Sequence, residues 1–216
     1  MPTTLETSIQ KIKQTGIISI LRGNYSADEL LRIGEALLAG SVTVMELTLN
    51  SPNALAALPK LLEHFGDRLL VGAGTVRVAT QARHAIEAGA QFMVSPNFDP
   101  ETVAVAHSYS VLHFPGVYTA TEVQTAVAAG CRMLKLFPMI DPVGPAYLKA
   151  LRGPFDDVDF MPTGGISLEN IADFARAGAV AVGLGSNLVR EPGQPTDEIT
   201  ARALALRAAW DGARHA

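Results

Sequence analysis

Lys135 is the residue whose type and position point most directly to covalent chemistry. It interrupts the apolar run Met-Leu-Lys-Leu-Phe at residues 133–137, a pattern typical of a buried β-strand. Burial disfavours the charged ammonium and lowers the pKa of a lysine. A neutral amine can attack a ketone and form a Schiff base. The simpler alternative is a lysine at a strand end whose stem is buried and whose ammonium reaches solvent.

Glu46 and Arg22 are two more charged residues, one within an expected strand and one at the end of another. Glu46 stands in the middle of an apolar run, and glutamate is almost never fully buried unless it is paired. Beside an amine, it could act as a general acid and base with a shifted pKa; the alternative is a structural ion pair with Arg22 or Lys135. Arg22 ends the first expected strand. It could bind a carboxylate or a phosphate through paired hydrogen bonds, or be an ordinary surface arginine.

Two glycine-rich turns follow the last two expected strands. They read Pro162-Thr163-Gly164-Gly165-Ile166-Ser167 and Gly183-Leu184-Gly185-Ser186-Asn187. Backbone N–H groups in such turns can surround an anion, and the N-terminus of a following helix adds its dipole. The loops after strands seven and eight are a recurrent phosphate site in (β/α)₈ barrels. The alternative is two tight turns that a compact barrel requires.

Weaker candidates end the third and fourth expected strands, where Thr75 offers a hydroxyl and Ser95-Pro96-Asn97 forms a turn. Neither a metal site nor a disulfide framework is expected, because the histidines show no metal-ligand spacing and Cys131 is the only cysteine. His113 lies inside a strand pattern, which is more typical of a hydrogen-bonded core histidine than of a ligand.

The elements that would position these residues recur along the whole chain. Eight short apolar runs predict strands at residues 17–21, 43–48, 69–73, 91–94, 111–114, 133–137, 158–161 and 179–183. Amphipathic stretches of helical length separate them, for example at 27–39, 53–65 and 80–88. Strands that alternate with helices indicate parallel βα units.

Eight such units predict one compact (β/α)₈ TIM barrel over residues 1–216, with a helix before the first strand. The fold uses roughly 200 residues or more, so a chain of 216 leaves little room for an inserted domain. In this fold the functional groups lie at the carboxyl ends of the strands. An open doubly wound sheet is the structural alternative, but the loop after the first strand has no G-x-G-x-x-G sequence.

Composition narrows the classes of partner. The net charge is −4 without a basic cluster, and no apolar stretch approaches a membrane span. Nucleic acid and membranes are therefore not expected partners. The first residues do not resemble a signal peptide, so a cytoplasmic location is expected.

The motifs together resemble the 2-keto-3-deoxy-6-phosphogluconate (KDPG) and 6-phosphogalactonate (KDPGal) aldolases. The resemblance extends over residues 16–188 and rests on Ile20-Leu21-Arg22-Gly23, Glu46-Leu47-Thr48-Leu49, Gly72-Ala73-Gly74-Thr75-Val76, Ser95-Pro96, Pro115-Gly116, Lys135-Leu136-Phe137-Pro138, the Pro162–Ser167 turn and Gly185-Ser186. It implies a class I aldolase without metal or other cofactor, usually a trimer, that cleaves a 2-keto-3-deoxy-6-phospho sugar acid to pyruvate and glyceraldehyde 3-phosphate.

The resemblance also implies roles for individual residues. Lys135 matches the Schiff-base lysine and Glu46 the general acid and base, while Arg22 matches the arginine near the substrate carboxylate. The matching pocket residues are Thr75, Pro96, Phe137 and Thr163, and the matching phosphate-site residues are Gly164, Gly165, Gly185 and Ser186.

Three questions stay open at the level of sequence. Asn50 stands where gluconate-type enzymes commonly carry arginine, whereas Thr163 is typical of the gluconate type. A preference for either configuration at C4 and a relaxed selectivity at C4 therefore both stay open. A family member acting on 4-hydroxy-2-oxoglutarate fits the same motifs. A phosphosugar isomerase or epimerase, or a non-catalytic phosphosugar-binding barrel, fits the fold.

Overall fold

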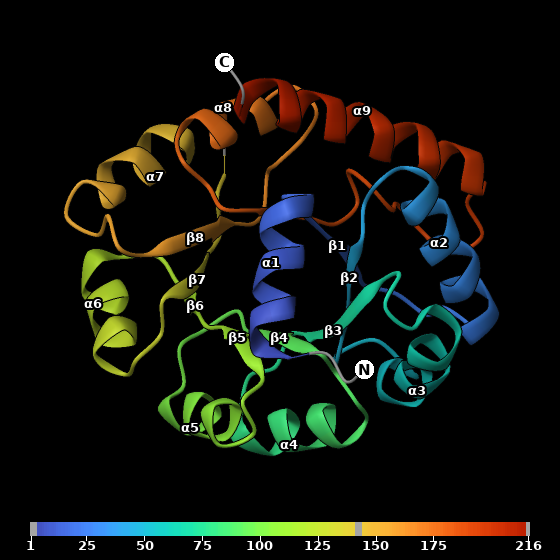
Figure 1. The fold of residues 1–216 in the computed structure, drawn as a ribbon, viewed down its shortest axis with the longest axis horizontal. Helices are drawn as coiled ribbons and strands as arrows, with labels where there is room; N and C mark the ends of the chain where they lie inside the picture. Colours follow the sequence, from blue (N-terminus) through green and yellow to red (C-terminus); the bar gives the residue numbers. More distant parts are fainter. Residues whose placement is uncertain (1–3, 141–143, 215–216) are drawn as a thin grey trace.

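The computed structural model describes residues 4–140 and 144–214. Parallel strands form a curled sheet that helices surround (Figure 1). The elements are α1 (Leu5–Thr15), β1 (Ile17–Leu21), α2 (Ala27–Ala39), β2 (Val44–Thr48), α3 (Ala54–Phe65), β3 (Leu70–Gly74), α4 (Ala79–Glu87), β4 (Phe92–Val94), α5 (Pro100–Ser108), β5 (Leu112–Phe114), β6 (Gly116–Val117), α6 (Ala120–Ala128), β7 (Met133–Leu136), α7 (Gly144–Arg152), β8 (Asp159–Pro162), α8 (Ile171–Arg176), β9 (Val182–Leu184) and α9 (Thr196–Arg214).

The eight expected strands are all present, and the expected helix before the first strand is α1. Most strand ends differ from the prediction by one residue, and β9 begins three residues later than expected. The sequence pattern does not predict β6. Proline has no N–H for a strand ladder, and Pro115 divides this stretch into β5, which pairs with β4, and β6, which pairs with β7.

Every strand pair is parallel, and the pairs form two sheets. One has the order β5-β4-β3-β2-β1-β9 and the other the order β6-β7-β8. The chain joins them through Pro115, and an isolated bridge between Thr163 and Gly183 links β8 to β9. The α/β class and the TIM-barrel-like curl of the sheet are therefore confirmed. In place of eight continuous strands, the residues described form nine short strands in two sheets.

The inner and outer faces of the strands pack into separate apolar clusters. The inner cluster consists of Ile12, Ile18, Val44, Leu70, Phe92, Val94, Leu112, Phe114, Met133, Met161, Val180 and Ala181. Alternation along a strand then places Glu46 on the same face as Val44, and Lys135 on the same face as Met133. The outer cluster fills the space between strands and helices. The sequence left open which face carries Lys135, and the structure assigns it to the barrel interior.

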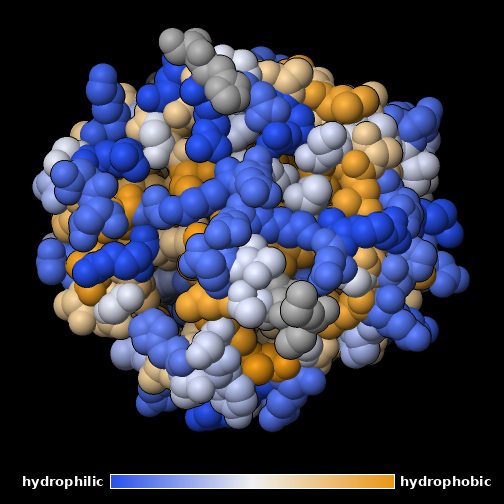
Figure 2. Space-filling view, in the orientation of Figure 1, coloured by the Kyte–Doolittle hydropathy of each residue, from blue (hydrophilic) through white to orange (hydrophobic). Residues whose placement is uncertain are grey.

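Helix α1 covers the end of the barrel where the strands begin. Its Ile12 is fully buried in the inner cluster, together with residues that start strands, such as Val44 and Met133. Figure 1 shows α1 lying across the centre of the ring of helices, and Figure 2 shows that this face of the molecule is mostly hydrophilic. The carboxyl ends of the strands therefore open on the opposite side of the molecule.

Local signals at two helix starts agree with the structure. Ser26 with Glu29, and Thr119 with Glu122, form complete capping boxes at the N-termini of α2 and α6, and these fix where the chain leaves the ends of β1 and β6. No helix within the described ranges has the length and apolar composition needed to cross a membrane.

Candidate active site

A cavity of about 330 Å³ opens at the carboxyl ends of β1, β8 and β9. Its walls are Ile20, Arg22, Thr163, Gly164, Gly165, Ile166, Gly183, Gly185, Ser186, Asn187, Val189 and Arg190. Six of the predicted site residues line it directly. The other five, Lys135, Glu46, Thr75, Pro96 and Phe137, lie on or just after the neighbouring strands β2, β3, β4 and β7.

Lys135 is buried, with only 6% of its surface exposed. In the β7–β8 register it is aligned with Met161, two residues before Thr163 in the cavity wall. Its Nζ atom lies 4.8 Å from the centroid of the Phe137 ring. Burial lowers the pKa of Lys135 below its usual value of 10.5, and the Arg22 charge lowers it further, while the Glu46 charge opposes the shift. At a given pH, a larger fraction of Lys135 is therefore in the neutral amine form than of a surface lysine.

Glu46 is 1% exposed and is paired in the β1–β2 register with Ile20, a cavity wall residue. Burial raises the pKa of Glu46 from 4.5 to about 7, and the charges of Lys135 and Arg22 limit that rise. Its Oε2 atom is buried and has no hydrogen-bond partner among the residues described. A carboxyl group half protonated near neutral pH can both accept and donate a proton.

The pKa shifts of Lys135 and Glu46 have the same main cause, which is burial. Burial is the largest cause of both and drives the amine and the acid toward their neutral forms, although each charge favours ionisation of the other. Lys135 and Glu46 therefore lie close enough to influence one another, in an environment that destabilises a permanent ion pair. This argues against the purely structural ion pair that the sequence left open.

Gly74 makes room for the Glu46 carboxyl group. A Cβ atom at Gly74 would lie 2.3 Å from Glu46 Oε1, a distance that forces the carboxyl group to move. No other side chain fits this position of β3 without displacing Glu46.

Gly74→Ala is therefore expected to lower kcat at least about tenfold, because a small displacement of a catalytic group is costly. It should also destabilise the fold by about 1–3 kcal/mol through overpacking. Steady-state kinetics and thermal unfolding measure both effects. Gly212→Ala, in α9 with no atom within 4 Å of the added Cβ, is the matched control. Wild-type kcat in Gly74→Ala would contradict this account of the Glu46 pocket.

Arg22, Thr75 and Thr163 supply polar groups around the cavity. Arg22 Nη2 donates to Thr75 Oγ1 at 3.4 Å, which links the ends of β1 and β3. Thr163 is 5% exposed, and its Oγ1 atom is buried without a partner among the described residues. An unpaired buried hydroxyl is costly, so a bound molecule that hydrogen-bonds Thr163 would remove that cost.

Pro96 and Phe137 flank the lysine from two sides. A Cβ atom at Gly116 would lie 2.3 Å from the Pro96 carbonyl carbon, and Gly116 pairs with Lys135 in the β6–β7 register. Pro96 thus packs on the backbone beside the lysine. Phe137 is 37% exposed, and a Cβ atom at Gly164 would lie 3.6 Å from its ring. The ring therefore lies between the lysine and the glycine turn.

The two glycine turns form one continuous wall. Gly164 and Gly165 have φ angles of 93° and 68°, in the left-handed region that favours glycine. The Asn187 side-chain amide donates to the Ile166 carbonyl at 2.6 Å, which ties the turn after β9 to the turn after β8. The Gly185 carbonyl accepts the N–H groups of Leu188 and Val189, so one helical turn starts at Gly185 beside the cavity.

Arg190 is a wall residue that no sequence motif predicts. It lies four residues after Ser186, in a stretch without a motif. The wall contains Arg22 and Arg190 and no acidic side chain. The cavity is therefore suited to an anionic ligand. A cluster of arginines across two distant loops leaves no signal in the linear sequence.

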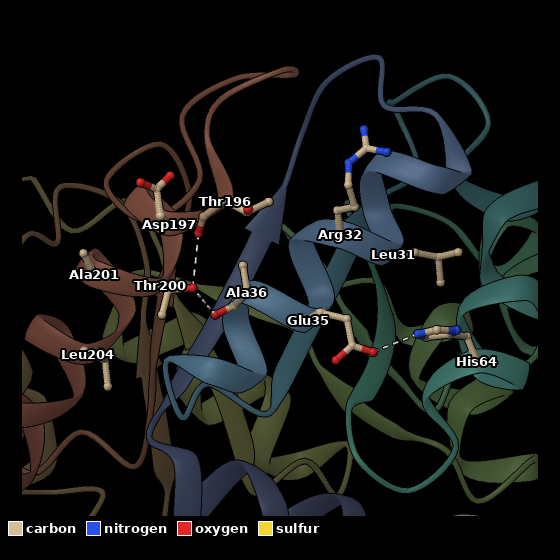
Figure 3. Close-up of a pocket in the computed structure, with 10 residues that line it drawn as sticks. All are labelled: Leu31, Arg32, Glu35, Ala36, His64, Thr196, Asp197, Thr200, Ala201 and Leu204. Atoms are coloured by element: carbon tan, nitrogen blue, oxygen red, sulfur yellow. Dashed lines mark hydrogen bonds and ion pairs between the residues drawn. The ribbon is translucent and has the colours of Figure 1, made fainter.

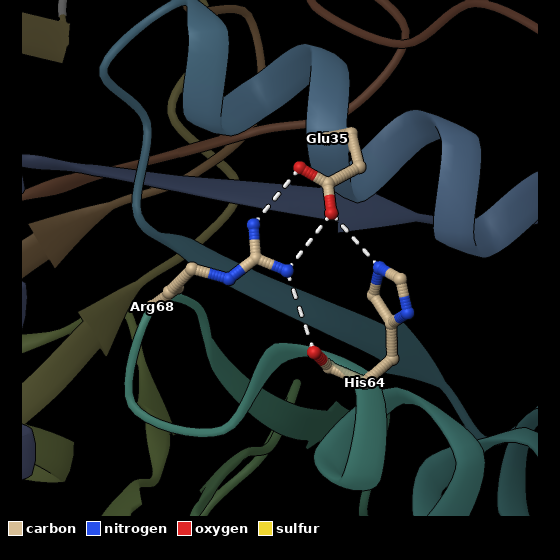
Figure 4. A network of polar contacts seen from close by, with 3 residues as sticks. All are labelled: Glu35, His64 and Arg68. Atoms are coloured by element: carbon tan, nitrogen blue, oxygen red, sulfur yellow. Dashed lines mark hydrogen bonds and ion pairs between the residues drawn. The ribbon is translucent and has the colours of Figure 1, made fainter.

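A larger cavity, of about 730 Å³, lies elsewhere, outside the barrel between α2, α3 and α9 (Figure 3). None of the predicted site residues lines it. On its rim, Glu35 accepts two hydrogen bonds from Arg68 and contacts His64 at 2.8 Å (Figure 4). These side chains are about half exposed. The residues predicted from the sequence thus gather at the smaller cavity and not at this larger one.

Comparison with known proteins places this geometry in a family. The family described as "Aldolase: KDPG and KHG aldolase" matches residues 8–201. The 2-dehydro-3-deoxy-6-phosphogalactonate aldolase of Escherichia coli is 37% identical over 195 residues, which cover 90% of this chain and 94% of that protein. The 2-dehydro-3-deoxy-phosphogluconate aldolase of Pseudomonas aeruginosa is 40% identical over 162 residues, covering 75% and 73% of the two chains.

A solved structure shows the same architecture. The KDPG aldolase of Legionella pneumophila, crystallised with pyruvate captured at low pH as a covalent carbinolamine intermediate, aligns with a TM-score of 0.83. The alignment covers 92% of this chain and 97% of that one at 31% sequence identity. With a family match across nearly the whole barrel, and with the buried lysine and glutamate inside it, this chain belongs to the KDPG and KHG aldolase family.

Proposed function

We propose that the protein is a class I aldolase that cleaves a 2-keto-3-deoxy-6-phospho sugar acid to pyruvate and D-glyceraldehyde 3-phosphate, without a metal or other cofactor. The observation that carries the proposal is Lys135, a lysine buried inside the barrel beside Glu46, with its pKa lowered by that burial. The covalent pyruvate adduct of the similar Legionella pneumophila enzyme supports the same chemistry here.

The reaction begins with the amine. Neutral Lys135 attacks the C2 ketone of the substrate and forms a carbinolamine. Glu46 donates a proton to the departing hydroxyl group, which leaves as water, and a protonated Schiff base remains. A pKa of about 7 lets Glu46 hold that proton at neutral pH and release it when needed.

The Schiff base then accepts the electrons of the bond that breaks. Glu46, now a carboxylate, takes the proton of the C4 hydroxyl group, directly or through a water molecule. The C3–C4 bond pair moves toward the iminium nitrogen, and glyceraldehyde 3-phosphate leaves as an aldehyde. The enamine is protonated at C3, and water releases pyruvate and free Lys135.

The two ends of the substrate are held by different walls. In this proposal Arg22 holds the carboxylate together with Thr75, and Thr163 supplies its unpaired hydroxyl. Pro96 and Phe137 shape the space around the lysine. The phosphate binds at Gly164, Gly165, Gly185 and Ser186, with Arg190 as a further positive charge on the wall. Binding energy from the remote phosphate orients the reacting carbons.

The test of the activity is a coupled assay that detects pyruvate with lactate dehydrogenase and NADH. It should be run on KDPG, on KDPGal and on 4-hydroxy-2-oxoglutarate, because these substrates share the ketone and differ in C4 configuration or in the phosphate. Pyruvate release from at least one of the phosphorylated acids is expected. Release from neither would refute the proposal.

The phosphate wall predicts selectivity for phosphorylated substrates. Ser186→Asp places a negative charge against the phosphate and should raise the KM for the phosphorylated acid by about 10- to 100-fold, the scale of one lost charge-assisted hydrogen bond. Trapping of free pyruvate on Lys135 should be unchanged, because pyruvate carries no phosphate. Ser108→Asp, exposed at the end of α5, is the control.

The same wall predicts how a non-phosphorylated analogue behaves. The 2-keto-3-deoxy sugar acid without phosphate should lose kcat as well as affinity, since the remote contact contributes to orientation. An unchanged kcat with only a raised KM would mean that the phosphate site contributes uniform binding alone.

Three further properties are proposed on family membership. The protein forms a homotrimer, it acts in the cytoplasm, and residues 1–216 form one domain. Light scattering coupled to size-exclusion chromatography measures the oligomeric state, and a mass of three chains is expected. A monomeric mass at micromolar concentration would contradict the first of these.

A further inference from the structure

Thr75 has an unusual backbone conformation for its residue type. Its φ angle is 58°, in the left-handed region, where a β-branched residue is a genuine outlier. Such a conformation costs about 1–3 kcal/mol and persists only where the surrounding structure enforces it. Thr75 follows Gly74, which makes room for Glu46, and its hydroxyl accepts from Arg22. The strained residue therefore connects two groups of the proposed site.

Ser95 forms a hydrogen bond with the backbone of Val76, the residue that follows Thr75. The Val76 N–H group donates to the Val94 carbonyl at 3.1 Å, and the Ser95 N–H group donates to the Phe114 carbonyl at 2.9 Å. The Ser95 hydroxyl donates to the Val76 carbonyl. Ser95 is 1% exposed, so water does not compete for these bonds. The ends of β3, β4 and β5 are thus joined at one buried serine, directly beside Thr75.

His113 completes the arrangement from the outer side of the barrel. Its Nε2 atom lies 2.7 Å from Ser95 Oγ. Because the Ser95 proton is donated to Val76, the proton of this contact belongs to His113, and Nε2–H donates to the serine oxygen. Nδ1 is then the unprotonated nitrogen, and it is buried without a partner among the residues described. Burial lowers the pKa of His113 to about 4, so the ring is neutral.

The direction of the His113 side chain excludes contact with substrate. Its neighbours Leu112 and Phe114 belong to the inner cluster, so alternation turns His113 toward the helices. Ser95 likewise follows Val94, an inner residue. Both groups act from behind the wall of the site, on the backbone that carries Thr75 and Pro96.

We propose that Ser95 and His113 are positioning residues, which hold Thr75 in its strained turn and thereby fix the Arg22 contact and the Glu46 pocket for catalysis. The inference rests on the proposed function. The competing explanation is that the pair only stabilises the barrel. In that case its loss would reduce the amount of folded protein but leave the turnover of each folded active site unchanged.

The first test compares variants at the two positions. Ser95→Ala and His113→Leu are expected to lower kcat about 10- to 100-fold per active site, counted by borohydride trapping of pyruvate on Lys135. His113→Gln keeps an N–H donor and should recover most of the loss. His107→Leu, an exposed histidine on α5, is the control and should match the wild type. Wild-type kcat in Ser95→Ala and His113→Leu would overturn the proposal.

The second test is a double-mutant cycle with Thr75→Gly. Glycine adopts a positive φ without strain, so the turn no longer needs Ser95 to enforce it. The effect of Ser95→Ala on kcat and on unfolding should therefore be smaller in the Thr75→Gly background than in the wild type. Strictly additive effects would overturn the proposal. If Ser95→Ala alone folds poorly, its unfolding midpoint still completes the cycle for stability, and the same criterion applies.

These outcomes remain distinct from failure of the proposed function. If the wild type gives no pyruvate adduct on Lys135, the aldolase assignment fails, whatever the Ser95 variants do. If the wild type forms the adduct and the variants turn over normally, only the positioning role is lost.

Discussion

Replacing Lys135 with methionine is expected to abolish the borohydride-trapped pyruvate adduct and to lower kcat/KM by at least about 10⁴-fold, the scale on which loss of a nucleophile acts. The amine is the only group in the proposed mechanism that becomes covalently bound to substrate. Without this amine no iminium forms, so no group accepts the electron pair of the C3–C4 bond when it breaks. Mass mapping of the trapped protein should place a three-carbon adduct on Lys135 in the wild type and nowhere in the variant.

The fold should survive this substitution. Methionine is about as long as lysine and apolar, and the Lys135 site already disfavours a charge, so stability is expected to be retained or to increase. Lys149→Met, on the exposed side of α7, is the matched control and should keep both adduct and activity. An adduct on a lysine other than Lys135, or substantial activity in Lys135→Met, would show that the Schiff-base assignment is wrong.

Replacing Glu46 with glutamine is expected to slow turnover by about 10²–10⁴-fold, the usual contribution of a general acid and base. The amide fills the same pocket beside Gly74 but cannot exchange protons. Adduct formation with pyruvate should become slow and not vanish, since Lys135 is still present. A rate close to that of the wild type would assign the proton transfers to another group.

The pH dependence of the same pair has a defined sign. The pKa of Glu46 is about 7, and in the proposed reaction Glu46 starts protonated, because it first donates a proton to the carbinolamine hydroxyl group. In the wild type, kcat/KM should therefore fall as the pH rises through about 7 and the free enzyme loses that proton. Glu46→Gln should lose that fall and keep whatever dependence the other groups impose.

The stability of the fold tests the state of Glu46 independently of activity, because removing this carboxyl group should stabilise the protein at high pH. Because the folded pKa of Glu46 lies above 4.5, the folded state binds this proton more tightly than the unfolded state. Ionisation of Glu46 therefore destabilises the folded state. This loss of stability is absent near pH 4, grows between pH 4.5 and 7, and is complete above 7, where it is on the order of 3 kcal/mol. Glu46→Gln should therefore raise the melting temperature at pH 8 and leave it nearly unchanged at pH 4.

Glu35→Gln is the matched control for the stability measurement. Its hydrogen bonds with Arg68 and His64 hold the pKa of Glu35 below its usual range, so its carboxylate stabilises the fold. Loss of this half-exposed network should lower stability at pH 8 by at most about 1 kcal/mol. If both variants shift the melting temperature in the same direction, the buried-carboxylate account of Glu46 is wrong.

The order of elements was predictable from the sequence because it depends on local signals. Apolar runs of strand length, capping boxes at Ser26 and Thr119, and alternating helices act over a few residues, so each can be recognised without knowledge of the rest of the chain. The same holds for Lys135, since one lysine inside an apolar strand is anomalous by itself. The sequence does not show that Pro115 divides a strand in two. That division depends on β5 and β6 pairing with different strands, which is a property of the assembled sheet.

What the sequence determined by itself is therefore the barrel class, the strand that carries each charged group and the alternation that puts Glu46 and Lys135 on definite faces. Only the tertiary structure decided that both faces point inward, that Gly74 makes room for one carboxyl group, and that Arg190 joins Arg22 in the wall of the cavity. It also revealed the contact from His113 through Ser95 to the strained turn at Thr75. The physical reason is that burial, charge interaction and packing act between residues distant in the chain, and no local pattern records them.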